Sequence, residues 1–98
     1  MTEQAADLPP DLAAAGWRWE AGALARSFRF RDFAAAFAFM TRVAALAEAA
    51  NHHPDWRNVW NRVEIRLFTH SAGRVTEKDI RLAREIEALD PPAARAVV

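Results

Sequence analysis

The sequence predicts an α+β domain: an antiparallel sheet of about four strands with helices packed on one face, in the order α-β-β-α-β-β-α. Two stretches, 17–30 and 56–70, alternate apolar and polar residues as strands do. Two others, 33–50 and 80–89, repeat apolar residues at helical spacing. Adjacent strands joined by short turns must be antiparallel, which leaves the helices one face of the sheet to cover. The length of 98 residues suits one domain, which we expect to span residues 1–98.

The first helix and the first strand pair are indicated by prolines and glycines. Two prolines precede a short helix over 11–15, where proline suits the first turn, and a glycine follows it. Residues 17–20 then alternate as a strand. Ala21 and Gly22 suit a tight turn, and residues 24–30 alternate again, which predicts the second strand of a hairpin.

The central helix, predicted over 33–50, is apolar around a wide arc. Asp32 can cap it, because its carboxylate can accept a hydrogen bond from a free N–H of the first turn. Its apolar residues form two stripes: Phe33, Phe37, Met40 and Ala44, and Ala36, Phe39, Val43 and Leu46. This arc is wider than contact with one sheet needs. Either the helix lies at the centre of a small core, or part of the arc is a subunit interface.

The second half predicts strand and then helix. Pro54 disfavours helical geometry in the residue before it, so the central helix must end there. From Val59 onward one face carries Val63, Ile65, Leu67 and Thr69, and the other carries Trp60, Arg62, Glu64, Arg66, Phe68 and His70. Asn61 tolerates a turn, so residues 56–59 are a candidate for a separate strand. The last helix follows a sequence typical of a capping box, Thr76-Glu77-Lys78-Asp79, and residues 90–92 would stop it.

Composition excludes several functional classes. The 13 basic and 13 acidic residues give no net charge, which argues against a nucleic-acid-binding domain. Without cysteine there is no disulfide, thiolate metal site or cysteine nucleophile. The longest apolar run, 33–40, is too short to span a membrane, and the first 16 residues contain no basic residue of a signal peptide. We therefore expect a cytoplasmic protein with no membrane or nucleic-acid partner.

All three histidines lie between residues 51 and 71, the one long stretch without alanine. His52 and His53 follow the central helix, and His70 ends the clearest strand. Imidazole titrates near neutral pH, at about 6.5, so such a group suits proton transfer. Solvated surface histidines and a metal site are the alternatives. A shared metal is awkward for adjacent histidines, whose side chains point apart in an extended chain.

Several motifs in this region resemble the pterin-4a-carbinolamine dehydratase family. They are Asn-His-His-Pro-Asp-Trp at 51–56, Asn-Val-Trp-Asn at 58–61, Thr-His at 69–70 and Thr-Glu-Lys-Asp-Ile at 76–80. The aromatic-rich stretches 28–33 and 37–44 also fit the family. The resemblance covers roughly residues 24–89.

The resemblance implies a hydro-lyase that converts 4a-hydroxytetrahydropterin to quinonoid dihydropterin, without metal or organic cofactor. It also implies tetrahydropterin recycling for aromatic amino acid hydroxylation, a functional link to phenylalanine hydroxylase, and a homodimer or homotetramer. By the resemblance, His52, His53 and His70 are catalytic, and the pterin is bound by Glu48, Asn51, Pro54, Phe68, Thr69 and Ser71. Some relatives are instead non-catalytic proteins on this fold, acting as transcription-factor dimerisation cofactors or in enzyme assembly.

Overall fold

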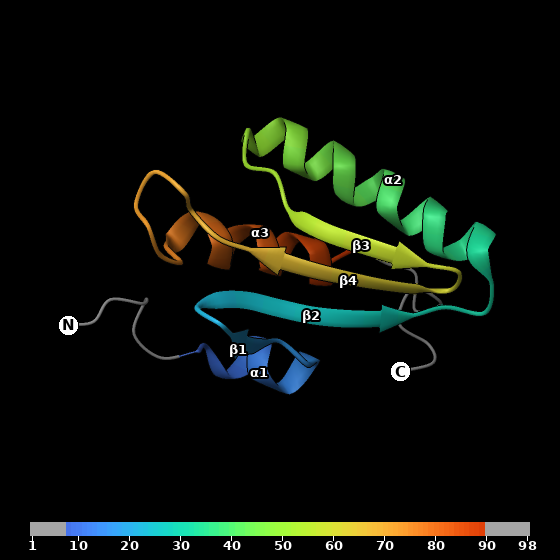
Figure 1. Cartoon of the computed structure of the whole chain (residues 1–98), viewed down its shortest axis with the longest axis horizontal. Helices are drawn as coiled ribbons and strands as arrows, with labels where there is room; N and C mark the ends of the chain where they lie inside the picture. Colours follow the sequence, from blue (N-terminus) through green and yellow to red (C-terminus); the bar gives the residue numbers. More distant parts are fainter. Residues whose placement is uncertain (1–7, 90–98) are drawn as a thin grey trace.

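The computed structural model describes residues 8–89 and confirms the predicted class and element order (Figure 1). The strands form one four-stranded sheet in the order β1-β2-β4-β3, with every neighbouring pair antiparallel. Both predicted domain limits, residues 1 and 98, and the predicted stop at 90–92 lie outside the described residues. The elements are α1 (Pro10–Ala15), β1 (Arg18–Glu20), β2 (Ala23–Arg29), α2 (Phe33–Ala50), β3 (Asp55–Val59), β4 (Arg62–Leu67) and α3 (Glu77–Glu87).

The two strand pairs have different turns. Ala21 and Gly22 have positive φ, 51° and 85°, as the predicted tight hairpin turn requires. The separate strand proposed over 56–59, with a turn at Asn61, is confirmed, because β3 ends at Val59 and β4 begins at Arg62. Trp60 lies in the intervening turn at φ 50°, not on a strand face. The Asn61 amide holds this turn by donating to the Phe30 carbonyl at 2.8 Å.

The core fills the space between the helices and one face of the sheet. Burial along β4 alternates, as expected when one face of a strand is buried, whereas β2 is buried at four consecutive residues, 23–26. The buried side chains include Leu24, Phe28, Val63, Ile65 and Leu67 from the sheet and Phe39, Val43, Leu82 and Ile86 from α2 and α3. The opposite face of the sheet carries ion pairs between charged side chains, and none of the helices within residues 8–89 covers it.

Only one stripe of α2 is packed inside. Ala36, Phe39, Val43 and Ala47 are buried, whereas Phe33 and Phe37 are 48% and 53% exposed. Two further large apolar residues, Val59 and Trp60, are 44% and 64% exposed. Figure 1 shows that the start of α2 and the β3–β4 turn lie at the same end of the molecule. We call Phe33, Phe37, Val59 and Trp60 the apolar end.

By length and composition alone, α2 passes as a membrane span, with 18 residues and a mean hydropathy of 1.4. The longest uninterrupted apolar run, 33–40, does not reveal this property. Thr41, Arg42 and Glu48 interrupt the run, but they lower the mean hydropathy of the helix only slightly. In the structure the buried stripe of α2 packs against the sheet and α3, which is the role of a core helix.

Side-chain contacts tie α3 to the N-terminal part of the chain. The buried Arg26 pairs with Glu87 at 3.0 Å, and the Trp17 indole donates to the same carboxylate at 2.8 Å. At the surface, Arg84 donates two hydrogen bonds of 3.0 Å to Asp11. These bonds hold the pKa of the Asp11 carboxyl below its ordinary value of 3.8. The short α1 is therefore attached to α3 by charge as well as by its buried Leu12.

Candidate functional site

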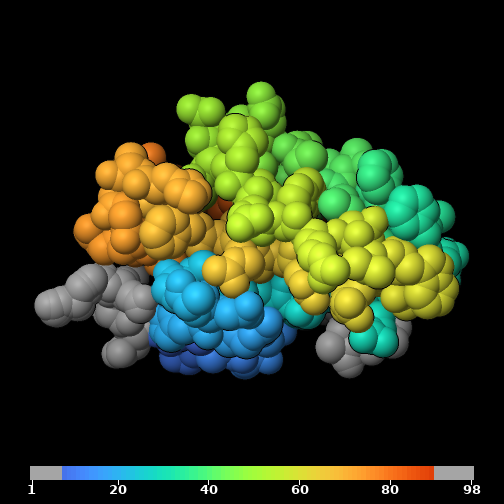
Figure 2. All heavy atoms as spheres, viewed as in Figure 1, coloured from blue at the N-terminus to red at the C-terminus, as the bar shows by residue number. Residues whose placement is uncertain are grey.

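The three histidines lie on two neighbouring segments, one after α2 and one after β4. Asn51 ends α2 in the left-handed conformation, φ 52°, which asparagine tolerates better than most residues. The chain then passes through His52, His53 and Pro54 into β3. Figure 2 shows a hollow between these residues, in green, and the loop after β4, in orange. The two segments that carry the three histidines therefore lie on either side of this hollow.

His52 is held by a carboxylate that has no exposed surface. Its Nε2 lies 2.6 Å from Oδ1 of Asp79, which is 0% exposed, and the imidazole itself is 12% exposed. The other oxygen of Asp79 accepts hydrogen bonds from the Thr69 hydroxyl at 2.6 Å and from the Thr76 N–H at 2.8 Å. One buried carboxylate thus joins the segment after α2, the end of β4 and the first turn of α3.

The hydrogen bonds around Asp79 determine which ring nitrogen of His52 carries a proton. An ionised carboxylate only accepts hydrogen bonds, so we assign a proton to Nε2 of His52. In the neutral imidazole, Nδ1 then has no proton and is free to accept one. A carboxylate that fixes the tautomer and orientation of a histidine is the arrangement of a general base.

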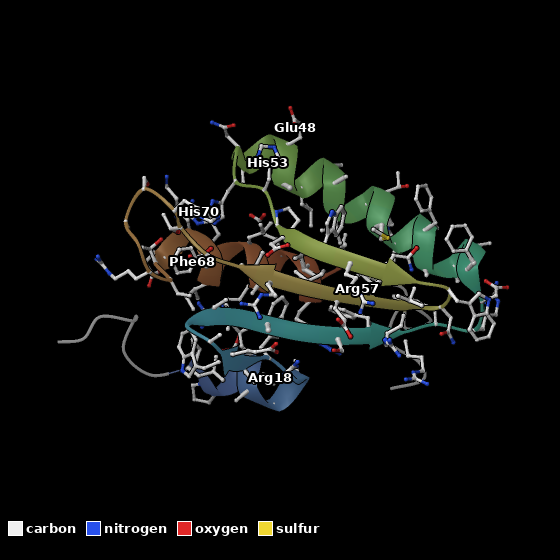
Figure 3. The ribbon with its side chains drawn as sticks, in the orientation of Figure 1. Arg18, Glu48, His53, Arg57, Phe68 and His70 are labelled. Carbon is white, nitrogen blue, oxygen red and sulfur yellow. The ribbon has the colours of Figure 1, made fainter. Side chains whose placement is uncertain are left out.

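His53 turns the other way. Its Nε2 lies 3.0 Å from Oε1 of Glu48, in the last turn of α2, and both side chains are largely exposed. Unlike His52, His53 therefore lies at the surface, beside the last turn of α2. Figure 3 shows Glu48 and His53 close together at the end of α2. The two adjacent histidines therefore have different carboxylate partners and different surroundings.

His70 lies at a cavity on the open side of the sheet. Its ring meets Phe68 edge to face with centroids 5.1 Å apart, and both residues lie beyond the end of β4 (Figure 3). Together with Asp55, Arg66, Ala21 and Ala23 they line a cavity of about 200 Å³. A flat aromatic and an imidazole at the wall suit a planar heterocyclic ligand.

His52 instead lines a larger cavity of about 370 Å³ between the end of α2 and α3. The rest of its lining is Ala49, Ala50, Glu77, Lys78, Arg81, Leu82 and Glu85. The structure thus places His52 on the helix side of the hollow and His70 on the open side, not in one closed pocket. Of the predicted pterin-binding residues, Phe68 lines the smaller cavity, Thr69 is buried against Asp79, and Asn51, Pro54 and Ser71 line neither cavity.

Potential metal ligands are dispersed. Within residues 8–89, no three histidine, aspartate or glutamate side chains are close enough together to hold a metal ion. Each nearby carboxylate contacts a different imidazole: Asp79 contacts His52, and Glu48 contacts His53. His52 and His53 are therefore held separately, each by its own carboxylate.

Asp79 is the residue that sequence reasoning missed. It was interpreted only as part of the capping box, and the structure does show that box, with Thr76 as N-cap. A signal was present, since Asp79 lies three, four and seven residues before Leu82, Ala83 and Ile86, on the apolar stripe of α3. A carboxylate on a buried stripe needs a hydrogen-bonding partner, and His52 and Thr69 supply it.

Comparison with known proteins gives a consistent result. The family model described as pterin 4 alpha carbinolamine dehydratase matches residues 1–89. A protein of Synechococcus sp. (strain WH7803), named "Putative pterin-4-alpha-carbinolamine dehydratase", is 59% identical over 73 residues, covering 74% of this chain and 78% of that protein. A protein of Rhizorhabdus wittichii with the same name is 57% identical over 75 residues, covering 74% and 77%.

Two solved structures are also similar. The crystal structure of a transcriptional coactivator/pterin dehydratase from Brucella melitensis has a TM-score of 0.74 and 45% identity, covering 80% of this chain and 87% of that one. A pterin dehydratase-like protein, identified as a RuBisCO assembly factor in the α-carboxysome, has a TM-score of 0.64 and 26% identity, covering 74% and 87%.

Proposed function

Since the chain belongs to the pterin 4 alpha carbinolamine dehydratase family, we propose that it is a hydro-lyase acting on 4a-hydroxytetrahydropterin. The observation that carries the proposal is the contact between His52 and the buried Asp79, which fixes an imidazole with one nitrogen free to take a proton. The two other imidazoles lie on the same two segments, His53 after α2 and His70 after β4. The product is quinonoid dihydropterin, and the proposed role is tetrahydropterin recycling for aromatic amino acid hydroxylation.

The reaction requires one proton to be removed and one to be supplied. The N5–H bond breaks, and its electron pair forms the double bond between N5 and C4a. The bond between C4a and the hydroxyl oxygen breaks, and the hydroxyl leaves as water once it has been protonated. A positioned acid or base contributes about 10²–10⁴-fold to such a step. Neither transfer needs an oxidant or a reductant.

The surroundings of the imidazoles support different roles for them. Nδ1 of His52 takes the N5 proton, and Asp79 acts as a positioning residue that holds the ring. His53, exposed beside α2, and His70, at the cavity on the open side of the sheet, supply the proton to the leaving hydroxyl. Glu48 orients His53 at 3.0 Å, and Phe68 supports His70 by its ring contact. Asn51, Pro54, Thr69 and Ser71 shape the two segments between which the pterin binds.

The proposal is tested by following the absorbance of synthetic 4a-hydroxytetrahydropterin in a stopped-flow instrument, with and without the protein. We expect the protein to accelerate its loss. His70→Ala, and at least one of His52→Ala and His53→Ala, should lower the rate about 10²–10⁴-fold with an unchanged circular dichroism spectrum. Three single variants with near-normal turnover would show that the histidines are not catalytic.

The alternative is a non-catalytic binding or assembly protein on the same fold, acting with a transcription factor or in enzyme assembly. The observation that favours it is the apolar end, where Phe37 and Trp60 are 53% and 64% exposed. The similar structures described as a coactivator and as an assembly factor support it as well. An unaccelerated reaction in the stopped-flow test would favour this alternative over catalysis.

A further inference from the structure

The cavity on the open side of the sheet contains a carboxylate with no partner of its own. Within residues 8–89, the side chain of Asp55 makes no hydrogen bond or ion pair. The other acids of this face are paired, Glu20 with Arg66 at 3.0 Å and Glu64 with Arg62 at 3.4 Å. Asp55 and Arg66 are opposite each other on β3 and β4, yet Arg66 turns toward Glu20. A negative charge is therefore left free at the wall of this cavity.

We infer that Asp55 binds the 2-amino-4-oxo edge of the pterin ring and selects for it, an inference that rests on the proposed function. The 2-amino group and N3–H of a pterin are adjacent donors on one planar edge, as in a guanidinium group. A carboxylate offers two acceptors that match them, and such paired charge-assisted bonds are strong and directional. Phe68 and His70, which line the same cavity, lie beside the plane of the ring.

This contact also orients the substrate. The pyrazine ring, which contains N5, lies at the far end of the bicycle from the 2-amino edge. With that edge at Asp55, N5 and C4a are directed away from the cavity wall and toward the hollow that the histidines border. Arg66 stays fixed by Glu20 at 3.0 Å and lines the same cavity, where it can donate to the 4-oxo group. Asp55 is thus a specificity-determining residue, not an acid or base.

Selectivity provides a test that does not depend on turnover. Lumazine is the same bicycle with an oxo group in place of the 2-amino group, so it presents an acceptor oxygen to a carboxylate. We would measure the binding of pterin and of lumazine by tryptophan fluorescence quenching or calorimetry. Unmodified protein should prefer pterin by about 10- to 100-fold. Asp55→Asn should lose most of this preference, because its amide can also donate to the oxo group.

Glu64→Gln is the matched control, since it removes one negative charge from the same face without lining this cavity. It should keep the preference for pterin. In turnover, Asp55→Asn should raise KM more than it lowers kcat. If Asp55→Asn keeps the full preference while the protein still dehydrates its substrate, the role of Asp55 is wrong and the proposed function stands. If the unmodified protein neither binds pterin nor accelerates dehydration, both are overturned.

Discussion

The most demanding test of the site is the substitution Asp79→Asn. The change keeps the size of the side chain but removes its charge and replaces one acceptor oxygen with an NH₂ donor. One oxygen can still accept from Thr69 and Thr76, which now lie 2.6 and 2.8 Å from the same atom. The new amide then faces Nε2 of His52, at the present 2.6 Å contact, and donates to it. His52 must move its proton to Nδ1 and loses the free nitrogen of a base.

The expected magnitudes follow from these contacts. Replacing charged hydrogen bonds in a buried position costs about 1–3 kcal/mol of unfolding free energy. For a domain of this size each kcal/mol lowers Tm by about 4–8 °C, so the variant should still fold at room temperature. The dehydration rate should fall about 10²–10⁴-fold, because the general base is in the wrong tautomer.

The assay combines stopped-flow turnover with ¹⁵N NMR of the histidine rings, which distinguishes the two tautomers. The stability-matched control is Trp17→Phe, which removes the indole hydrogen bond to Glu87 far from the hollow. That variant should lose stability while keeping its rate. The reasoning is refuted if Asp79→Asn turns over at the normal rate. It is equally refuted if the tautomer of His52 is the same in both proteins, or if Trp17→Phe slows turnover equally.

Three further predictions use other parts of the molecule. Protein dialysed against a chelator should keep its full dehydration rate, and a loss restored by zinc or iron would contradict proton transfer by histidine alone. Light scattering should show at least a dimer at micromolar concentration. Phe37→Asp should shift the protein toward the 11.0 kDa monomer, because Phe37 is 53% exposed at the apolar end. A monomeric wild-type protein would refute a subunit interface at the apolar end. Asp11→Asn should flatten the acid dependence of stability. Because the folded pKa of Asp11 is lowered, its contribution is present above 3.8 and lost as the pH falls. Urea unfolding at acid and neutral pH measures this, and an unchanged pH dependence would count against it.

The fold could be predicted from the sequence because each local signal agreed with the final architecture. Pro9 and Gly16 mark the two ends of α1, and the caps at Asp32 and Thr76 mark the starts of α2 and α3, as the structure has them. The β3–β4 turn was harder. A tryptophan at φ 50° is uncommon, and the Asn61 amide, which holds the turn, donates to a backbone carbonyl 31 residues away. The alternation of apolar and polar residues along a strand does not reveal such a turn.

The site was predictable only in part. The histidines were visible as a cluster, but their separation to two sides of the hollow depends on how α3 packs beneath the segment after α2. The role of Asp79 depends on a contact between residues 27 apart. The capping box by itself explains an acidic residue at position 79. That local explanation left the second role of Asp79, the contact with His52, unrecognised. Asp55 was noted only within a motif, because whether a carboxylate is paired depends on neighbouring strands.

The His52–Asp79 contact also determines when the site can form during folding. A nascent chain emerges from its N-terminus, and α3 is the last described element to be made. The sheet can pair before then, yet the imidazole has no carboxylate until the first turn of α3 docks. Closing this loop has an entropic cost that only the completed packing offsets. Partly synthesised chains therefore contain all three histidines but lack an oriented base, so any pterin chemistry must await the whole domain.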